Sequence, residues 1–493
     1  MTDAHDVRGE PRLLVDGKLT EATSGGAFDN IDPATEAVLG QTADAAAADM
    51  EAAIGAARRA FDDTSWSTDH EFRTRCLAQL HAAVSAHKEE LRAVTVAEVG
   101  SPIALTYANQ VDLPIDDLAH WIEWPVRFDY ERWLPERDVF GQPQRRVVRR
   151  EAVGVVGAIT PWNFPLNLNL AKLGPALAAG NTVVLKPAPD TPWSATMLGR
   201  LVAEETDIPP GVVNIVASSD HMVGEVLTTD PRVDMITFTG STKTGRRIMA
   251  KGADTVKKVF LELGGKSANI VLDDVADPPG AIGVSAIGVC THSGQGCAIT
   301  TRLLLPRSRY DEMLEVADTM MASVTYGDPW DPANLQGPLI NPTQRARVLE
   351  YIAKGKEEGA RLVRGGGTPA HLDKGYFVEP TLFADVDPKA TIAQEEIFGP
   401  VLAVIPYEDD DDAVRIANDS IYGLSGAVTS GSEERALDVA RRIRTGTLMV
   451  NGGFWNSPDV PFGGYRQSGV GRENGLEGFE EYLEVKAIAL PAR

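Results

Sequence analysis

The chain has few cysteines, three in 493 residues: Cys76, Cys290 and Cys297. None forms a Cys-x-x-Cys pair, and no Cys/His cluster has zinc-site spacing, which argues against disulfides and a structural metal and is typical of a reducing cytosol. No run of about 18 apolar residues occurs, so no membrane-spanning helix is expected. The first ten residues lack the apolar core of a signal peptide. We therefore expect a cytoplasmic protein without metal or membrane contact.

Basic residues are also scarce. Lys and Arg number 47 against 70 Asp and Glu, a net charge of −23. Such a surface repels phosphate backbones, so no nucleic-acid partner is expected. The arginine-rich run 145–151 is therefore better read as a solvated or subunit-bridging strand than as a nucleic-acid patch. The acidic run 408–412 could suggest a cation site, but a helix start is favoured because acidic residues stabilise helix N-termini.

The order of strand-like and helix-like runs predicts an α/β protein. With 43% hydrophobic residues, the chain is too long for one core and should form two or more domains. Ranges 45–61 and 71–99 have helical spacing. Strand-like runs then alternate with helical ones, which implies largely parallel sheets with helices on both faces. These runs are 153–159, 182–185, 212–216, 234–238 and 257–261, then 302–305, 382–385, 401–405 and 447–451.

A possible nucleophile lies between an apolar, helix-like run, 281–290, and the strand-like run 302–305. Cys297 follows Gly294-Gln295-Gly296, whose glycines let a small molecule approach the backbone. A free thiol is mostly protonated near neutral pH, so a reactive one needs a partner. The candidate is Glu262, which interrupts an apolar strand before two glycines. Taken singly, Cys297 could be a small buried hydrophobe and Glu262 a solvent-facing strand residue.

Together the two segments resemble a known family. Leu261-Glu262-Leu263-Gly264-Gly265-Lys266, followed by a cysteine 35 residues after the glutamate, is similar to the aldehyde dehydrogenase superfamily, NAD(P)-dependent enzymes that oxidise aldehydes to carboxylic acids. The resemblance runs from about residue 15 to 485. It implies a Rossmann-like parallel-sheet cofactor domain (1–135 and 152–265), an α/β catalytic domain (266–466) and a small β oligomerisation arm (136–151 and 467–493). It also implies a small-molecule aldehyde substrate and a homodimer or homotetramer.

The resemblance assigns four catalytic roles. Cys297 would be the nucleophile and Glu262 the base that activates water. Asn163, held between Pro161 and Pro165, would stabilise the oxyanion together with the Cys297 amide, although a structural turn is the other reading of this asparagine. Glu473 would relay the proton taken up by the base.

The same resemblance predicts a cofactor site at the carboxyl ends of the strands, where such sheets bind ligands. Lys186 would hold the adenosine ribose, and the helix start after Gly240 suits a pyrophosphate. Lys172, otherwise a snorkelling helix lysine, would lie near the cofactor and proton path. Glu396 would bind the nicotinamide ribose and Phe398 the nicotinamide ring, unless Phe398 is ordinary core. The full cofactor set is Thr160, Pro161, Trp162, Lys172, Lys186, Gly240, Ser241, Gly245, Leu263, Glu396 and Phe398.

One position departs from the family pattern. Pro189 stands three residues after Lys186, where a glutamate is common. A carboxylate there would bind the ribose hydroxyls of NAD and repel the 2′-phosphate of NADP. NAD is the expected cofactor, and NADP stays open.

Three other functions were weighed. The CoA-acylating branch, such as a semialdehyde dehydrogenase, typically lacks the glutamate at position 262. A Cys/His acyl hydrolase could use His292, but it leaves the nucleotide-type strand ends unexplained. A non-catalytic relative is disfavoured by the intact motifs. Adding an aldehyde with NAD and following reduced cofactor separates the dehydrogenase from the hydrolase.

The substrate is the least defined property. Betaine aldehyde dehydrogenases enclose the ammonium in aromatic side chains, whereas Ala171 and Thr291 flank the motifs here. Aromatic residues still suggest an apolar tunnel, which predicts a medium aliphatic or aromatic aldehyde; they are Trp162, Phe164, Phe454 and Trp455.

Overall fold

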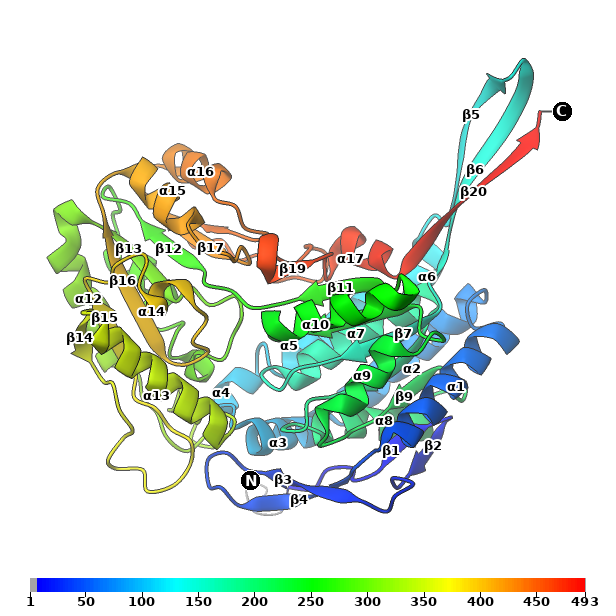
Figure 1. Ribbon diagram of the computed structural model, residues 1–493, viewed down its shortest axis with the longest axis horizontal. Coiled ribbons are helices and arrows are strands. Elements are labelled where there is room, and N and C mark those ends of the chain that lie inside the picture. The colour runs from blue at the N-terminus through cyan, green and yellow to red at the C-terminus, as the bar shows by residue number, and fades with distance from the viewer. Residues whose placement is uncertain (1–6, 493) are drawn as a thin grey trace.

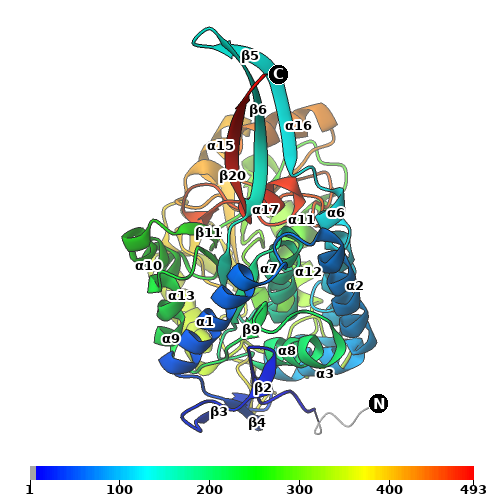
Figure 2. The ribbon, with the colours of Figure 1, turned by 90° about the vertical axis from the view of Figure 1, so that its right-hand side faces the viewer.

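The structure is a computed structural model and describes residues 7–492. Two large sheets lie next to each other, each with helices on both faces, and a narrow three-stranded sheet projects from the molecule beside one of them (Figures 1 and 2). The predicted α/β fold class is confirmed. The expectation about the first ten residues falls largely on residues 1–6, which lie outside the described part of the chain.

The larger sheet has eight strands. Its five central strands are parallel, and antiparallel strands extend both edges. In spatial order the strands are β19 (Gly469–Val470), β11 (Lys258–Glu262), β10 (Met235–Thr239), β7 (Val155–Ile159), β8 (Thr182–Lys186), β9 (Val213–Ile215), β1 (Leu13–Val15) and β2 (Lys18–Thr20).

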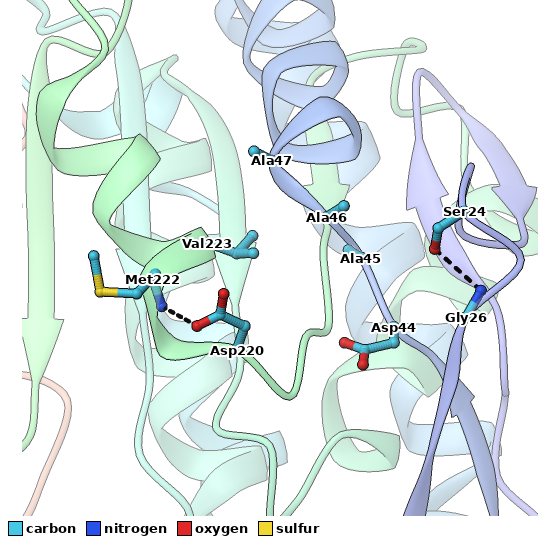
Figure 3. A pocket seen from close by; sticks show the side chains of 9 residues that line it. All are labelled: Ser24, Gly26, Asp44, Ala45, Ala46, Ala47, Asp220, Met222 and Val223. Atoms are coloured by element: carbon cyan, nitrogen blue, oxygen red, sulfur yellow. Dashed lines mark hydrogen bonds between the residues drawn. The ribbon is translucent and has the colours of Figure 1, made fainter.

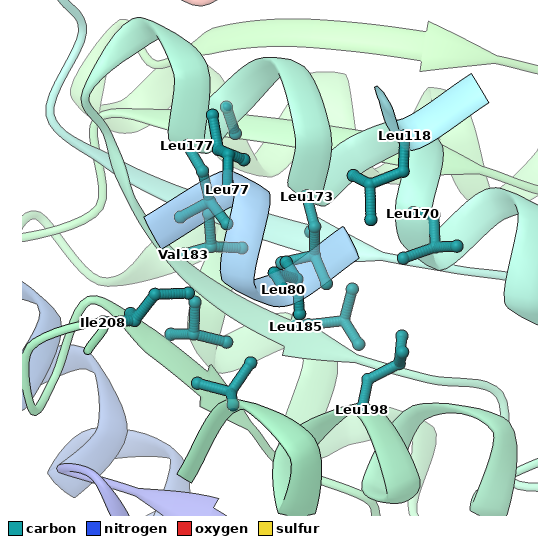
Figure 4. Close-up of a cluster of buried hydrophobic side chains, with 14 of the residues drawn as sticks. Leu77, Leu80, Leu118, Leu170, Leu173, Leu177, Val183, Leu185, Leu198 and Ile208 are labelled. Atoms are coloured by element: carbon teal, nitrogen blue, oxygen red, sulfur yellow. The ribbon is translucent and has the colours of Figure 1, made fainter. Parts of the chain in front are cut away.

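Helices cover both faces of this sheet because its buried strands are apolar on both sides. In β8, Val183 and Leu185 pack with one helix layer, shown in Figure 4, and Val184 packs with the other. The first layer contains α2 (His70–Ala86), α7 (Pro165–Ala179) and α8 (Trp193–Glu205). The second contains α1 (Ala47–Asp63), α9 (His221–Thr229) and α10 (Thr242–Gly252).

Further helices complete this half of the molecule. They are α3 (Lys88–Val99), α4 (Ile103–Thr106), α5 (Asp112–Leu118), α6 (Trp124–Arg127) and α17 (Gly475–Glu481). A two-stranded antiparallel sheet, β3 (Ala27–Ile31) and β4 (Val38–Ala43), lies near the N-terminus (Figure 1).

The second sheet has seven strands, all parallel except β14. In spatial order they are β14 (Arg361–Arg364), β15 (Thr381–Ala384), β16 (Val401–Tyr407), β13 (Arg302–Pro306), β12 (Ala268–Val271), β17 (Gly426–Thr429) and β18 (Met449–Val450). Its helices are α11 (Pro278–Ala286) and α12 (Tyr310–Ala322), packed in one cluster, and α13 (Pro342–Glu357), α14 (Thr391–Gln394), α15 (Asp410–Asn418) and α16 (Glu433–Arg442), packed in the other.

The projecting sheet joins distant segments. Strand β6 (Gln142–Ala152) pairs with β5 (Glu131–Val139) and with β20 (Leu483–Pro491), in an antiparallel register that matches Val485 with Arg150. Residues 145–151 and the C-terminal strand, both assigned above to the oligomerisation arm, therefore lie side by side in one sheet. The division into domains stays a prediction, and two strands lie outside its boundaries: β5 begins before 136, and β19 belongs to the eight-stranded sheet.

Several predicted elements differ in detail. The helical range 71–99 is two helices, because the chain breaks at His87, whose ring nitrogens contact Glu90 and Glu205. The helix-like run 281–290 ends at Ala286. The strand-like run 447–451 forms only β18 at the sheet edge, and Asn451 ends it with a left-handed φ of 48°. Within the seven-stranded sheet, three short strands had no sequence prediction, β12, β14 and β17. Two of them, β12 and β17, contain residues that disfavour strands.

The acidic run 408–412 starts a helix, as predicted. Asp409 caps α15 by accepting a hydrogen bond from the Asp412 amide. Within residues 7–492, no helix has both the length and the apolar character needed to cross a membrane.

Candidate active site

The loop that carries Cys297 is tightly constrained. After α11 the chain forms a 3₁₀ turn, Thr291–Gly294, in which His292 and Ser293 have left-handed φ values of 51° and 57°. A Cβ on Gly294 would lie 2.1 Å from the Gly399 carbonyl oxygen, so only glycine fits. Gln295 is fully buried and receives a hydrogen bond of 3.0 Å from the Ile340 amide. The backbone before Cys297 is therefore held in place on several sides.

Glu262 meets this loop from the other sheet. It is the last residue of β11 and is 1% exposed. Its Oε2 lies 3.8 Å from the Cys297 Sγ, close enough for a weak S–H···O hydrogen bond. Gly265 permits the approach, since a Cβ there would lie 2.6 Å from the Cys297 carbonyl oxygen. The fold thus brings together the predicted nucleophile and base.

Both groups favour their neutral forms. Burial, followed by the charge of Glu473, raises the pKa of the Glu262 carboxyl well above its ordinary value. Burial, followed by the charge of Glu262, likewise raises the pKa of the Cys297 thiol. In its ionised form a carboxylate with a raised pKa is a stronger base, so the ionised fraction of Glu262 can take up a proton.

Asn163 lies against the same loop. Its side-chain Nδ2 donates a 2.8 Å hydrogen bond to the Gln295 carbonyl, two residues before Cys297. Its own backbone carbonyl accepts hydrogen bonds from Gln110 Nε2 at 2.9 Å and from His292 Nε2 at 2.8 Å. An amide nitrogen carries two hydrogens, so one stays free for an oxyanion formed at Cys297. Asn163 is therefore both a loop anchor and a possible donor.

His292 is not arranged as a base for Cys297. Its Nε2 donates to Asn163, and its Nδ1 has no hydrogen-bond partner among residues 7–492. The ring is 1% exposed, and burial lowers its pKa to about 4, so it is neutral near pH 7. Its bond to the Asn163 carbonyl gives it a structural role, which disfavours the Cys/His hydrolase hypothesis.

Lys172 and Glu473 form a buried ion pair near the base. Lys172 Nζ lies 2.9 Å from Glu473 Oε1, and the two side chains are 0% and 4% exposed. Lys172 also donates to Thr237 Oγ1 at 3.2 Å. The charges of both groups act on Glu262, Glu473 raising and Lys172 lowering its pKa. The structure places the predicted relay residues beside the predicted base.

The predicted cofactor residues lie along the carboxyl edge of the eight-stranded sheet. Thr160 follows β7 and Lys186 ends β8, and both are buried. Gly240 follows β10, and Ser241 caps α10 by accepting from the Thr244 amide at 3.2 Å. Gly245 lets α10 pack closely, because a Cβ there would lie 2.6 Å from Leu263. This edge of the sheet offers the Lys186 ammonium and the free backbone amides at the start of α10. Both suit the binding of a dinucleotide.

The remaining cofactor residues extend this row from both sheets. Glu396 Oε1 accepts a 2.9 Å hydrogen bond from the Gly265 amide, next to the Glu262 segment. Burial raises the Glu396 pKa to about 7. Phe398 has a left-handed φ of 62°, and its ring packs edge-on against Trp162, with centroids 5.4 Å apart. Trp162, which follows Pro161, therefore meets the segment 396–398 across the two sheets.

Three residues of the site were not predicted. Gln110 and Gln295 hold the oxyanion candidate and the cysteine loop by the contacts described above. Ser468 receives an amide hydrogen bond from Gly423 at 3.0 Å and donates to the Gly264 carbonyl at 2.6 Å, which fixes the segment after Glu262. Gln295 lies inside the recognised segment Gly294-Gln295-Gly296, so its burial was the missing information. Gln110 carries no local signal.

The other two cysteines are unsuited to act as nucleophiles. Cys76 and Cys290 are both 0% exposed, and burial raises their pKa values to about 11 and about 12. In the described range 7–492, no group of three or more His, Cys, Asp or Glu side chains is arranged to hold a metal ion.

Comparisons with known proteins agree with this geometry. The model of the aldehyde dehydrogenase family matches residues 19–488. A 3-succinoylsemialdehyde-pyridine dehydrogenase from a Pseudomonas species is 42% identical over 98% of this chain and 99% of its own length. An NAD⁺-bound aldehyde dehydrogenase of Mycobacterium tuberculosis is 43% identical, with a TM-score of 0.93 over 98% of both chains. An indole-3-acetaldehyde dehydrogenase mutant of P. syringae, in complex with NAD⁺ and IAA, is 37% identical, with a TM-score of 0.94 over 99% of this chain and 98% of its own.

Proposed function

Because the chain belongs to the aldehyde dehydrogenase family, we propose that it oxidises an aldehyde to the carboxylic acid with NAD⁺, using Cys297 as nucleophile and Glu262 as base. The observation that carries the proposal is the 3.8 Å approach of the Cys297 Sγ to Glu262 Oε2. The solved relatives bound to NAD⁺ support the choice of cofactor.

The first half-reaction is addition. The Cys297 sulfur attacks the carbonyl carbon, and its proton passes to a nearby acceptor, for which Glu262 is positioned. The free hydrogen of the Asn163 amide and the Cys297 backbone N–H stabilise the oxygen, which becomes negative as the adduct forms. Bound NAD⁺ supplies the hydride acceptor, and loss of hydride leaves a thioester on Cys297.

The second half-reaction is hydrolysis. Glu262 first passes the proton from Cys297 on to Glu473. It then takes a proton from water as the water attacks the thioester, and Cys297 leaves as a thiolate while the acid is released. Glu262 Oε1 is buried without a partner among the described residues, so it is free to accept that proton. Glu473 is paired with Lys172 and its charge acts on Glu262, so Glu473 is the proposed relay. The presence of Glu262 favours hydrolysis over transfer to CoA.

The proposed substrate is a medium aliphatic or aromatic aldehyde. Phe164 borders the cysteine loop, since a Cβ on Gly296 would lie 3.8 Å from its ring. Trp455 stacks on Phe454 and on Phe462, with ring centroids 6.4 and 5.0 Å apart. These aromatic side chains suit an apolar tail. Related dehydrogenases have been named for indole-3-acetaldehyde or solved with octanal, which supports the same substrate class.

Replacing Glu262 by Gln tests the mechanism. The variant should still release about one equivalent of NADH per chain, in a burst that is slower than the first turnover of the parent because Cys297 loses its proton without Glu262. Steady turnover should then be slower by about a hundredfold or more, because the thioester waits for an unassisted water. Stopped-flow absorbance measures the burst, and mass spectrometry of the intact protein detects the acylated Cys297.

Controls separate the alternatives. Cys297→Ser should give neither burst nor adduct, while NAD⁺ binding persists. Steady turnover equal to that of the parent would show that Glu262 is not the base. A parent enzyme that turns over only when CoA is added belongs instead to the acylating branch.

A further inference from the structure

The carboxylate expected to distinguish NAD⁺ from NADP⁺ is missing at position 189. If the proposed function holds, the ribose of the adenosine lies near Lys186, and the residue that usually supplies a negative charge there is Pro189. Proline has no group that could attract a hydroxyl or repel a phosphate. Any charge-based selection must come from elsewhere in the chain.

Ser218 connects Lys186 to the Asp44 carboxylate and to the backbone of Asp220. Lys186 is 3% exposed, its stem packs on Gly224, and its Nζ lies 3.4 Å from the Ser218 carbonyl. The Ser218 hydroxyl lies 3.3 Å from Asp44 Oδ1. It also accepts a hydrogen bond from the Asp220 amide at 3.2 Å. Asp44 and Asp220, which are 176 positions apart in the chain, therefore both lie beside the serine whose carbonyl contacts the lysine.

The same two aspartates line a cavity of about 360 Å³ between the starts of α1 and α9 (Figure 3). Asp44 is fixed by the Ser219 amide at 2.8 Å and by the Ser219 hydroxyl at 2.7 Å. Asp220 caps α9, its Oδ1 accepting from the Met222 amide at 2.8 Å. Both carboxylates are thus held in position before any ligand arrives. Burial lowers the Lys186 pKa to about 8, and the charges of Asp220 and Asp44 oppose that shift, which shows that both charges reach the lysine.

The nearest competing cation is already paired. Arg247 contacts Met222 of the cavity wall, with its Nη2 4.0 Å from the sulfur. Its Nε, however, is bound to Glu225 Oε2 at 2.5 Å. A phosphate entering this cavity would meet the Asp44 and Asp220 carboxylates in its wall, while Arg247 beside the wall is already paired with Glu225.

We infer that Asp44 and Asp220 take the place of the missing glutamate and select NAD⁺ over NADP⁺. A ribose 2′-hydroxyl can donate a hydrogen bond to a carboxylate oxygen beside Lys186, whereas a 2′-phosphate dianion is repelled by both aspartates. The inference rests on the proposed function, since it takes the adenosine end of the cofactor to lie at Lys186.

Calorimetric binding of NAD⁺ and NADP⁺ to the full chain, without aldehyde, tests the inference apart from turnover. The parent should bind NADP⁺ at least about tenfold more weakly than NAD⁺. Asp220→Asn keeps the acceptor oxygen that caps α9, since Asn also caps helices. Asp44→Asn keeps an acceptor for the Ser219 amide, and its NH2 group can donate to the Ser219 hydroxyl. Each should tighten NADP⁺ binding by about three- to tenfold, and the double variant by more, since the repulsions act on one phosphate. NAD⁺ binding should change by less than about threefold.

The matched control is Asp254→Asn, which removes the same charge from the exposed turn after α10 and should leave both affinities unchanged. Unchanged NADP⁺ affinity in folded Asp44 and Asp220 variants would overturn the inference. So would parental NADP⁺ binding as tight as NAD⁺ binding. Failure of the parent to bind either dinucleotide would instead overturn the proposed function.

The salt dependence of the parent gives a second test that needs no variant. If repulsion by the aspartates dominates, raising the ionic strength from about 0.05 to 0.5 M should bring the two affinities closer together. If attraction by Lys186 dominates, the preference for NAD⁺ should instead grow with salt, and the inference would be wrong.

Discussion

Cys297 is surrounded by carboxyl groups rather than by cations. Burial is the main cause of its raised pKa, and the charges of Glu262, Glu396 and Glu473 add to it. Cysteines activated by a neighbouring cation have lowered pKa values and react readily near neutral pH. Here the resting thiol keeps its proton, so it should become reactive only when a base accepts that proton.

The pH dependence of alkylation tests this resting state. Without cofactor, Cys297 should react slowly with iodoacetamide at pH 7, and the rate should still rise above pH 9, because a raised pKa lowers the thiolate fraction at every pH below it. Mass spectrometry of the intact protein gives the rate. Only one label is expected, since Cys76 and Cys290 are fully buried.

Glu262→Gln gives the matched comparison for this profile. The substitution removes one negative charge beside the sulfur, so the midpoint should move to lower pH, yet stay above that of a free cysteine because burial remains. A parent midpoint near or below pH 8 would contradict the pKa direction. An unchanged midpoint in the variant would show that the Glu262 charge does not reach the thiol.

The residues of the site were predictable where a motif carried them. Cys297, Glu262 and Asn163 lie in short segments rich in glycine or proline. These motifs indicate the chemistry without any knowledge of the structure of the segments between them. Gln110 holds the Asn163 carbonyl from a segment with no such pattern, so its role depends on the tertiary approach alone. The partner of Lys172 was equally hidden, because Glu473 is 301 residues away.

At the scale of elements, the strand that carries the base depends on its edge partner. Strand β19 pairs antiparallel with β11, matching Gly469 with Glu262. Gly469 has a φ of 145°, and a Cβ on it would lie 2.1 Å from the Leu261 carbonyl oxygen. The adjacent Ser468 holds the Gly264 carbonyl. A side chain at 469 would therefore push β19 away from the base.

Gly469→Ala should reduce both stability and activity. Because the clash is with backbone, we expect the free energy of unfolding to fall by about 2 kcal/mol or more, within the range of strained-backbone substitutions. The rate of the hydrolytic step should fall as well, since Glu262 shifts with β11. Chemical denaturation and single-turnover kinetics measure the two effects.

Gly452→Ala is the matched control. Gly452 also has a left-handed φ, 79°, but a Cβ there would meet no atom within 4 Å. Gly452→Ala should lower the free energy of unfolding by only about 1 kcal/mol, because alanine disfavours a left-handed backbone. It should leave the hydrolytic rate unchanged. Equal losses in the two variants would mean that the close packing of β19 on β11 contributes nothing.

Helices and strands were predicted correctly from the sequence where apolar runs are long. The strands that become β7, β8, β10 and β11 are buried on both faces and were recognised from continuous apolar runs. The break at His87 was missed because apolar spacing continues through it and the local contacts that end α2 involve Glu205, far along the chain. The strands β12 and β17 were missed because Asn269 and Gly426 interrupt their apolar character, although both lie in the middle of the sheet.

At the scale of the whole molecule, the projecting sheet exposes apolar side chains. Figures 1 and 2 show β5, β6 and β20 extending away from both large sheets. Phe140 at the tip is fully exposed, and Trp133 and Val485 are 54% and 62% exposed. The outer strands β5 and β20 each have a free edge among the described residues, and such edges can pair with another chain. We therefore propose that this sheet joins subunits of a homodimer or homotetramer.

Shortening the chain tests that role. A variant ending at Leu483 loses β20 but keeps the buried Leu483, so the eight-stranded sheet should stay folded and bind NAD⁺. Light scattering after size exclusion should show a dimer or tetramer for the parent and a smaller assembly for the variant, because β6 has lost its partner. A chain ending at Pro491 retains β20 and should assemble like the parent.

Val485→Asp places a charge on the exposed face of β20 without removing any strand, and it should also weaken assembly. If both variants keep the parental mass while binding NAD⁺ normally, the subunits meet through another surface.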